Sequence, residues 1–328
     1  MTQIVLPQAT DFANFEPASG QVVFEPESAG AGYWVGCPSI MHDPARQSFL
    51  LTYRRRRPRG DGSDRGYQCG IAESRDGITF TPIWTVQKEE LSSSSMERFA
   101  LTYAPDGSYL LYISYVDPAD NRWRLDVIRA DQPDRFNVSQ AQSIFTAANT
   151  GTEGVKDPVV LRIGPAYYLF ASFAHARDFS TTERTQAHGS ADIYNTGMTV
   201  FPTGVGVSRD GIHFQWLGEV LPVGAGWDRY QSRLTGIVPL THGFLGFYDG
   251  SASVEENYEE RAGLVTSFDL KHWDRLTPDS PWATSAFASG SLRYVAALPV
   301  DAQLWLYYEY ARPDGAHELR HVRLTMKG

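Results

Sequence analysis

Five segments of the chain share one pattern, a turn followed by a strand-like apolar run. The runs are SFLLTYR from Ser48, SYLLYIS from Ser108, AYYLFAS from Ala166, GFLGFYD from Gly243 and QLWLYYE from Gln303. Their start positions are spaced by 60, 58, 77 and 60 residues. Apolar runs of this length between turn residues indicate β-strands. A repeat of this size, carried along the whole chain, predicts a β-propeller in which each repeat forms one blade.

A further strand follows each of these runs. The candidates are YQCGIAES from Tyr67, RLDVIRA from Arg124, TGVGVS from Thr203, RAGLVTS from Arg261 and ELRHVRL from Glu318. Three of them lead into similar motifs, SRDGITF from Ser74, SRDGIHF from Ser208 and SFDLKHW from Ser267. In such a Ser-x-Asp turn the Asp side chain caps backbone N–H groups, and we expect the final aromatic ring to pack between blades. We interpret these motifs as structural.

The predicted fold is a single all-β domain over residues 1–328, a five-bladed β-propeller. The blades are expected at residues 33–90, 91–148, 149–224, 225–284 and 285–328. The last repeat ends without a fourth strand, and we expect residues 20–27, with the strand-like Gln21–Phe24, to supply it. Closing the ring in this way removes the exposed sheet edges that an open array would have. No linker rich in Pro, Gly and Ser divides the chain.

Composition narrows the class of partner. Hydrophobic residues make up 42% and charged residues 20% of the 328 residues, as in soluble globular proteins. A net charge of −9 argues against nucleic-acid and anionic-membrane partners. The one basic cluster, Arg54–Arg57, is expected to be a solvated strand end. Two cysteines, Cys37 and Cys69, indicate no disulfide framework, and Met1–Pro7 does not resemble a signal peptide. We therefore expect a cytoplasmic protein.

The innermost strand of each blade lines the axis of a propeller, and this is where polar side chains suggest a site. Counting back from each second strand gives the axial candidates Glu97, Asp157, Arg233 and Arg293, with Arg98, Lys156 and Arg229 beside them. Because strand side chains alternate, we expect only one residue of each adjacent pair to face the axis. Glu97 and Asp157 are the candidate catalytic residues.

Two carboxylates on neighbouring strands suit the hydrolysis of a glycosidic bond. One acid protonates the leaving oxygen, and the other activates water or attacks the anomeric carbon. Crowding near the axis is expected to raise the pKa of one of the two carboxyls. A structural interpretation stays open beside this one, in which each carboxylate only pairs with Arg233 or Arg293 in an ionic ring.

Further binding candidates come from loops and strand ends. The third repeat carries an insertion, about His175 to Pro202, that explains the spacing of 77 residues, and long loops in compact domains are usually functional. Asp249 ends a buried strand before the acidic run of residues 255–260, which we expect to be solvated. The candidate substrate-binding residues are Trp34, Arg54, Arg98, His175, Arg233, Asp249 and Arg293. No spacing resembles a zinc site and no cofactor is expected, while an axial calcium ion stays open.

The repeats, together with Lys156-Asp157-Pro158 opening a blade, resemble the five-bladed glycosidases of glycoside hydrolase families 43, 32, 68 and 130. Ser95-Met96-Glu97-Arg98 is similar to the acidic-Asp-Pro-Arg strand of family 130, and Tyr248-Asp249-Gly250 is similar to its Tyr-His-Gly. The chain departs from families 43 and 32 at Gly36–Ser39, where their first-blade Asp is missing. The resemblance implies a two-carboxylate site nearest to family 130, which includes phosphorylases that hold phosphate with basic residues.

Three functions follow as alternatives. The first is a glycosidase that acts on a short or modified glycoside through Glu97 and Asp157. The second is a glycoside phosphorylase in which Arg98, Arg233 or His175 binds phosphate. The third is a non-catalytic propeller that binds a carbohydrate or another protein, and the missing first-blade Asp favours it.

Overall fold

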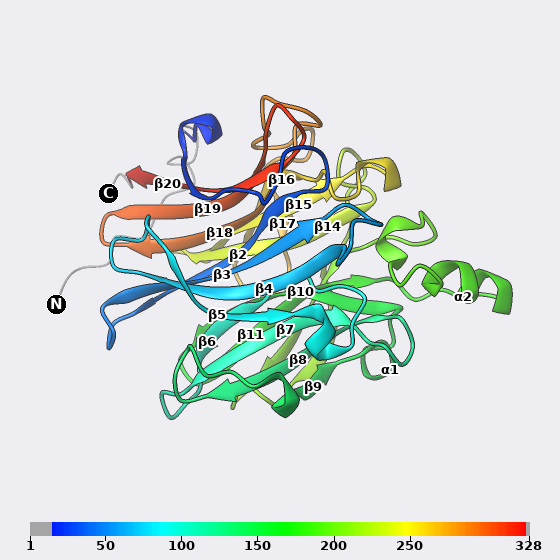
Figure 1. Ribbon diagram of the computed structural model, residues 1–328, viewed down its shortest axis with the longest axis horizontal. Helices are drawn as coiled ribbons and strands as arrows, with labels where there is room; N and C mark the ends of the chain where they lie inside the picture. The colour runs from blue at the N-terminus through cyan, green and yellow to red at the C-terminus, as the bar shows by residue number, and fades with distance from the viewer. Residues whose placement is uncertain (1–14, 326–328) are drawn as a thin grey trace.

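The computed structural model describes residues 15–325, which are almost entirely β-structure (Figure 1). The expectation about Met1–Pro7 lies outside these residues. The strands are β1 (Gln21–Phe24), β2 (Trp34–Asp43), β3 (Ser48–Arg57), β4 (Arg65–Ser74), β5 (Thr81–Gln87), β6 (Ala100–Tyr103), β7 (Tyr109–Val116), β8 (Trp123–Ala130), β9 (Gln142–Phe145), β10 (Gly154–Ile163), β11 (Ala166–Ala174), β12 (Thr203–Ser208), β13 (Gln215–Leu221), β14 (Gln231–Pro239), β15 (Phe244–Ser251), β16 (Arg261–Ser267), β17 (Asp274–Arg275), β18 (Leu292–Val300), β19 (Gln303–Ala311) and β20 (His317–Thr325).

Helices are few and short among the described residues. They are α1 (Ala147–Thr150), α2 (Thr181–His188) and 3₁₀ turns at Pro17–Ser19, Lys88–Leu91, Val138–Gln140, Ile193–Asn195 and Val254–Glu256. Within residues 15–325 we find no helix with the length and apolar character to cross a membrane.

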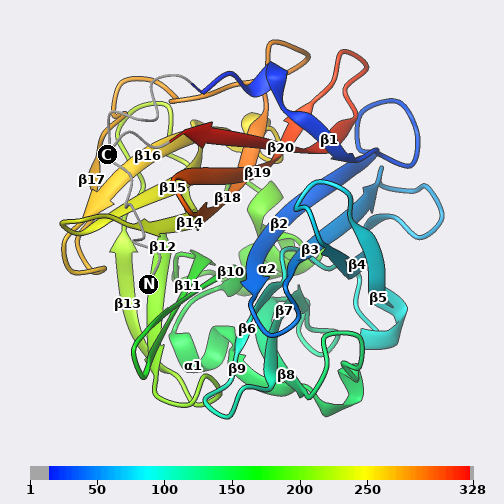
Figure 2. The same ribbon diagram turned by 90° about the vertical axis from the view of Figure 1, so that its left-hand side faces the viewer.

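Consecutive strands pair antiparallel in groups, namely β2 to β5, β6 to β9, β10 to β13, β14 to β17, and β18 to β20 with β1. Figure 2 shows these groups arranged around a common centre. Single parallel contacts join three groups, so the strands form one 12-stranded and two four-stranded sheets, none of them closed. The fold is therefore propeller-like and nearly all-β. Its five-blade count and ring closure stay predictions.

The N-terminal strand lies where the sequence pattern puts it. β1 pairs antiparallel with β20, with Gln21 opposite His321 and Val22 opposite Arg320. The expectation that an N-terminal strand completes the last repeat is confirmed at the level of strand pairing.

The Ser-x-Asp turns have the structural role expected of them. In the first, one carboxylate oxygen of Asp76 accepts hydrogen bonds from the N–H groups of Ile78 and Thr79, both at 2.8 Å. These hydrogen bonds hold the pKa of Asp76 well below its usual range. The ring that follows, Phe80, packs edge-on against Tyr307 of the neighbouring group at 5.9 Å between centroids. The same capping recurs at Asp210 and Asp269.

The hydrophobic core lies between neighbouring strand groups. One cluster, for example, brings Leu50 and Ile71 of β3 and β4 against Leu111 and Ile113 of β7. Each sheet thus buries both faces against its neighbours, which explains the near-continuous apolar runs in the sequence. The innermost strands β2, β6, β10, β14 and β18 are left facing the common centre.

Candidate active site at the centre of the strand groups

The inner strands are interrupted by bulges at a common level. The pairing register shifts between Gly36 and Ser39 in β2, Lys156 and Val159 in β10, Leu234 and Gly236 in β14, and Arg293 and Ala296 in β18. Three bulge residues have positive φ, namely Cys37 at 54°, Asp157 at 61° and Tyr294 at 54°. Such angles are uncommon for residues other than glycine, and bulges re-aim side chains beside functional sites.

These bulges overturn the expectation that only one residue of each adjacent pair faces the axis. Lys156 and Asp157 are both buried, and so are Glu97 and Arg98. Simple alternation requires an extended strand; the left-handed residue Asp157 breaks it in β10, whereas Glu97 and Arg98 precede β6 and lie in no regular strand. Charged side chains therefore crowd the centre more densely than the sequence pattern indicates.

The two candidate catalytic carboxylates meet at one hydroxyl. The Tyr294 hydroxyl lies 3.5 Å from Oε2 of Glu97 and 3.4 Å from Oδ2 of Asp157. Glu97, Asp157 and Tyr294 are each 1% exposed or less. The separation of the two carboxylate oxygens therefore cannot exceed the sum of these distances. This upper limit covers both the roughly 5–5.5 Å separation of retaining glycosidases and the lower end of the roughly 6.5–9.5 Å range of inverting ones.

Glu97 is held in its ionised form by guanidinium groups. Burial opposes ionisation, but Arg54, Lys156 and Arg56 outweigh it and lower the pKa of Glu97 to about 2. Arg54 makes a short ion pair with Oε2, and Arg56 lies 3.4 Å from Oε1. The basic cluster is therefore not a solvated strand end as expected. Strand alternation turns Arg54 and Arg56 into the centre and leaves only Arg55 and Arg57 partly exposed.

Asp157 is held by a different set of donors. Arg233 donates to its Oδ2 at 2.9 Å, and the backbone N–H of Arg98 donates to Oδ1 at 3.2 Å. The Lys156 ammonium lies 3.9 Å from Oδ2 and 4.0 Å from the ring centre of Tyr194. Asp157 therefore pairs with Arg233, as the ionic-ring interpretation requires, while Glu97 pairs with Arg54 and Arg56.

Further ion pairs connect these two carboxylates around the centre. Arg233 bonds Asp249 at 2.7 Å and lies 3.5 Å from Glu260, which in turn bonds Arg293 at 2.7 Å. Arg293 also bonds Glu309 at 2.6 Å, and Glu309 lies 3.5 Å from Arg54. We call the whole set the axial ion cluster. Its cations are Arg54, Arg56, Arg98, Lys156, Arg233 and Arg293, and its carboxylates are Glu97, Asp157, Asp249, Glu260 and Glu309, all at most 5% exposed.

Asp249 differs from the other carboxyls in this cluster. Burial, together with the nearby charge of Glu260, outweighs Arg233 and raises the pKa of Asp249 to about 6. Its two oxygens accept the backbone N–H of Tyr294 at 3.0 Å. Glu260, by contrast, is held ionised by Arg233 and Arg293 against the cost of burial, which lowers its pKa to about 2. The cluster thus holds carboxyls whose pKa values are shifted in opposite directions, upward for Asp249 and downward for Glu260.

Several cluster residues were not candidates from the sequence. Tyr294 and Glu309 were not considered, and Glu260 was expected in a solvated acidic run although it is 1% exposed. One signal was present in the repeats. Arg54, Asp249 and Glu309 each end the aligned seven-residue run of their repeat, as do Ser114 and Ser172.

Two binding candidates are not available to a ligand at the centre in this conformation. Trp34 stacks on His317 at 4.5 Å, and the guanidinium groups of Arg56 and Arg293 lie 5.0 Å and 4.8 Å from its ring centre. Its ring is therefore packed, not a free stacking platform. His175 is exposed, and its ring nitrogen contacts the backbone oxygen of Ala176, away from the axial ion cluster.

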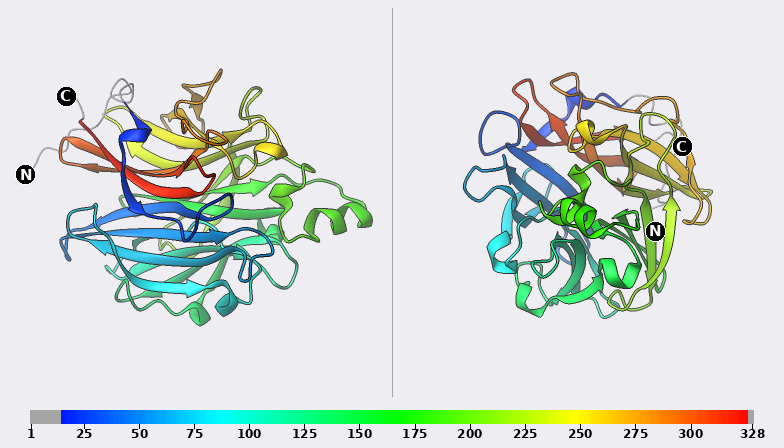
Figure 3. Two further views of the ribbon diagram at one scale, coloured as in Figure 1. Left: turned by 45° about the horizontal axis from the view of Figure 1, so that its top comes forward. Right: turned by 90° about the vertical axis from the view of Figure 1, so that its right-hand side faces the viewer.

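One end of the centre is covered by the insertion of the third repeat. In Figure 3 α2 lies in front of the central strands. We call residues 188–196, which follow this helix inward, the axial cover. Asp192 of the cover accepts from Arg59 at 2.8 Å, lies 3.7 Å from Arg65 and makes a short hydrogen bond with the Tyr258 hydroxyl. His188 contacts Glu153 at the start of β10 at 2.9 Å.

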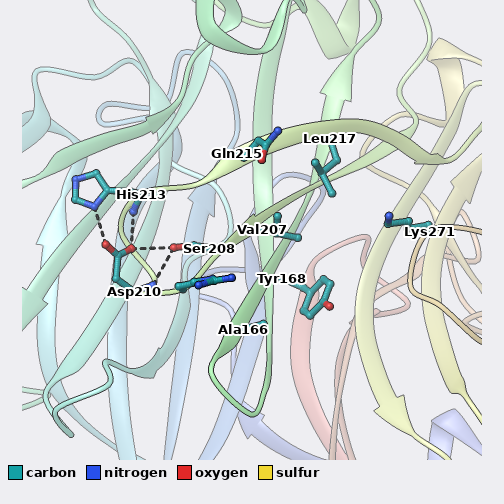
Figure 4. Close-up of a pocket in the computed structure, with 10 residues that line it drawn as sticks. Ala166, Tyr168, Val207, Ser208, Asp210, His213, Gln215, Leu217 and Lys271 are labelled. Carbon is teal, nitrogen blue, oxygen red and sulfur yellow. Dashed lines mark hydrogen bonds and ion pairs between the residues drawn. The ribbon is translucent and has the colours of Figure 1, made fainter.

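A large cavity lies elsewhere, on the outer surface. It measures about 640 Å³ and is lined by β11, β12 and β13 residues and by Lys271. Figure 4 shows that its Asp210 is already engaged with Ser208 and His213 in the Ser-x-Asp turn. No group of metal-binding side chains was found in residues 15–325. The carboxylate of this cavity is thus engaged in a structural turn, whereas Glu97 and Asp157 lie at the centre.

Comparison with solved structures identifies proteins of the same fold. A glycosyl hydrolase from Bacteroides ovatus is 13% identical and aligns over 97% of this chain and 90% of its own, with a TM-score of 0.60. The chain has the fold of glycoside-acting enzymes. Beta-1,2-mannobiose phosphorylase from Listeria innocua is 13% identical over 99% and 97%, with a TM-score of 0.59. A structure from family 130, described as mannoside phosphorylases that include hydrolases of beta-1,2 mannosidic linkages in Candida mannan, is 14% identical over 98% and 93%, with a TM-score of 0.60.

At these identities the likeness concerns the fold. No protein-family model matches the chain, and no curated protein matches its sequence. The expected resemblance to family 130-type propeller proteins is confirmed at the level of structure.

Proposed function

We propose that this protein is a five-bladed propeller enzyme that hydrolyses a short or modified glycoside within the axial ion cluster. The observation that supports this most directly is the meeting of Glu97 and Asp157 at the Tyr294 hydroxyl. Two carboxyls around a reacting bond are the minimum for glycoside hydrolysis. The fold shared with hydrolases and phosphorylases of glycosides adds support.

The roles follow from the protonation states. Glu97, with its pKa lowered to about 2, is the base that takes a proton from water or the nucleophile that attacks the anomeric carbon. Asp157 lies across Tyr294 and stabilises the positive charge that develops on the sugar. Asp249, with its pKa raised to about 6, is the group suited to deliver a proton to the leaving oxygen. The aglycone then leaves as an alcohol, and water supplies the new hydroxyl.

Phosphorolysis is the second candidate, and the surplus of cations favours it. The axial ion cluster has one more cation than carboxylate, and phosphate would replace water as the nucleophile. Arg98 and Arg233 are the cations for which the sequence predicts this role. Small carbohydrates are the expected substrates in either case.

Substrate access requires movement of the axial cover. The catalytic candidates are buried, so a sugar reaches them only when residues 188–196 swing away from Arg65 and Tyr258. Lids of this kind exclude water during reaction and commonly limit turnover.

The test is a screen of aryl glycosides and short oligosaccharides with and without phosphate, on wild type, Glu97→Gln, Asp157→Asn and a matched control. Glu309→Gln is that control, because Glu309 is equally buried and also pairs with Arg54 but contacts neither Tyr294 nor Asp157. Removing either partner of such a buried pair costs about 3–5 kcal/mol of stability. Loss of an acid–base group, or of a group that stabilises charge in the transition state, costs a factor of about 10³ in rate.

The proposal expects Glu97→Gln and Asp157→Asn to lose activity by that factor, and Glu309→Gln to stay within tenfold of wild type. Dependence on phosphate would decide for phosphorolysis. Equal losses in all three variants, or no turnover of any substrate by wild type, would favour the ionic-ring and binding interpretations.

A further inference from the structure

Arg98 is the cation of the axial ion cluster that has no ion pair among the described residues. Its side chain is buried, with 3% of the residue exposed, and its Nη1 donates to the backbone oxygen of Thr235 at 2.6 Å. Its Nε has no hydrogen-bond partner. Arg54, Arg233 and Arg293, equally buried, each bond at least one carboxylate.

An isolated buried cation is costly to maintain. Transferring a charged group out of water without a counter-charge is strongly unfavourable, so buried charges are normally paired. Burial lowers the pKa of Arg98 to about 10, although Asp157 and Asp249 act against this from farther away. A single negative charge beside Arg98 would supply the missing ion-pair partner.

A small cavity lies beside this side chain. It measures about 60 Å³ and is lined by Arg98, Ser39, Thr235 and Gly236, with aliphatic walls that include Val159 and Ile237. At about 10–15 Å³ for each water position, it has room for roughly four waters or one small ion with water. Ser39 and Val159 follow the bulges of β2 and β10, whereas His188 of the axial cover contacts Glu153, which precedes β10. The cavity therefore lies on the far side of the bulges from the cover.

We propose that this cavity binds a small monovalent inorganic anion, with chloride as the physiological ligand. Arg98 provides the charge, and the Ser39 hydroxyl lies in the same lining. The single positive charge of Arg98 matches a halide better than phosphate or sulfate, because the cavity lining holds no second cation to balance their further negative charge. The proposal is independent of the reaction assigned to Glu97 and Asp157. The side chain of Arg98 lines the cavity, and its backbone N–H donates a hydrogen bond to Asp157, so the anion would lie close to a candidate catalytic residue.

Bromide is the probe because it is close to chloride in size and visible by anomalous scattering. Crystals of the wild-type protein soaked in sodium bromide should show an anomalous peak in the cavity beside Arg98. In solution, the Tm of wild type should rise as chloride or bromide replaces gluconate, an anion too large for the cavity, at constant ionic strength. Binding to the folded state alone produces such a rise.

Arg98→Met should abolish the halide-dependent rise in Tm. Arg56→Met is the matched control, since it removes a buried cluster cation that already has a carboxylate partner, and it should keep the halide effect. A bromide-soaked wild-type crystal without a peak in the cavity would overturn the proposal even if Arg98→Met fails to fold. So would a halide effect that survives in Arg98→Met.

Discussion

Asp192 is the residue whose loss should most directly loosen the axial cover. It is fully buried, and one of its oxygens takes contacts from Arg59, Arg65 and the Tyr258 hydroxyl. Asp192→Asn keeps the size of the side chain and removes its charge. The amide oxygen can still accept from Tyr258, so the substitution acts mainly on the two arginines.

The exposure of Arg59 and Arg65 determines how much free energy the closed cover loses in Asp192→Asn. The Arg59 side chain is 41% exposed, so its ion pair contributes about 0.5 kcal/mol. The Arg65 side chain is 4% exposed but keeps its hydrogen bond to the Ala191 oxygen, so losing the charged partner costs about 1.5 kcal/mol. Together these make opening of the cover about 2 kcal/mol easier, which is roughly a 30-fold increase in the open population.

Hydrogen exchange measures this directly. The N–H groups of Ala191, Asn195 and Thr196 are hydrogen-bonded within the cover and should exchange about 30-fold faster in Asp192→Asn. Asp228→Asn is the control, because Asp228 is equally buried and pairs with Arg275 in another loop. Unchanged exchange at these three amides, or equal acceleration in both variants, would refute the view that Asp192 latches the cover.

Three other outcomes follow from the geometry. Tyr294→Phe keeps the ring against Arg233 but removes the hydroxyl between Glu97 and Asp157, which should cost about 1 kcal/mol of stability. The two carboxylates lose a hydrogen-bond donor, so the acidic limb of the pH–rate profile should move to higher pH. An acidic limb at the wild-type pH would contradict the contact. Asp249, with its pKa raised to about 6, binds a proton more tightly in the folded state, so its contribution to stability falls by up to ~3 kcal/mol as pH rises from about 4 to 6. In pH-dependent denaturation, Asp249→Asn should lack this fall in unfolding free energy. If the unfolding free energies of variant and wild type change with pH in parallel, the raised pKa is refuted. Asp210→Ala should lower the unfolding free energy by about 1–2 kcal/mol through loss of its turn capping, measured in urea, with activity retained.

The fold was predictable because each repeat contains the apolar runs and turn residues that determine its strands. The run beginning at Ser48 and the run beginning at Gln303 carry the same apolar pattern, and both form second strands of antiparallel groups. In the turn at Ser74 the carboxylate of Asp76 caps N–H groups only two and three residues away, so the local sequence determines the geometry of the turn. That residues 20–27 add a strand to the last repeat was predictable from a count of missing strands, and β1 does pair with β20.

The site was predictable only in part, because its geometry depends on the bulges. Glu97 and Asp157 were predicted from their positions in the repeats, and both lie close to the Tyr294 hydroxyl. Tyr294 has a left-handed backbone conformation that the pattern of apolar residues does not predict. Glu260 belongs to the acidic run of residues 255–260, whose composition predicts a solvent-exposed segment. Its burial results from two arginines contributed by other strands, Arg233 and Arg293, and such long-range pairing leaves no local signal.

The pairing of β1 with β20 has a consequence for how the protein is made. β1 is synthesised long before its partner β20, with Gln21 opposite His321. Contacts so distant in sequence form slowly, because closing a long loop costs entropy before any contact compensates for it. The last group of strands therefore stays incomplete, with an unpaired edge, until β20 has been synthesised. A nascent chain stalled before β20 should expose that edge and recruit chaperones, while the earlier groups can already pair among themselves.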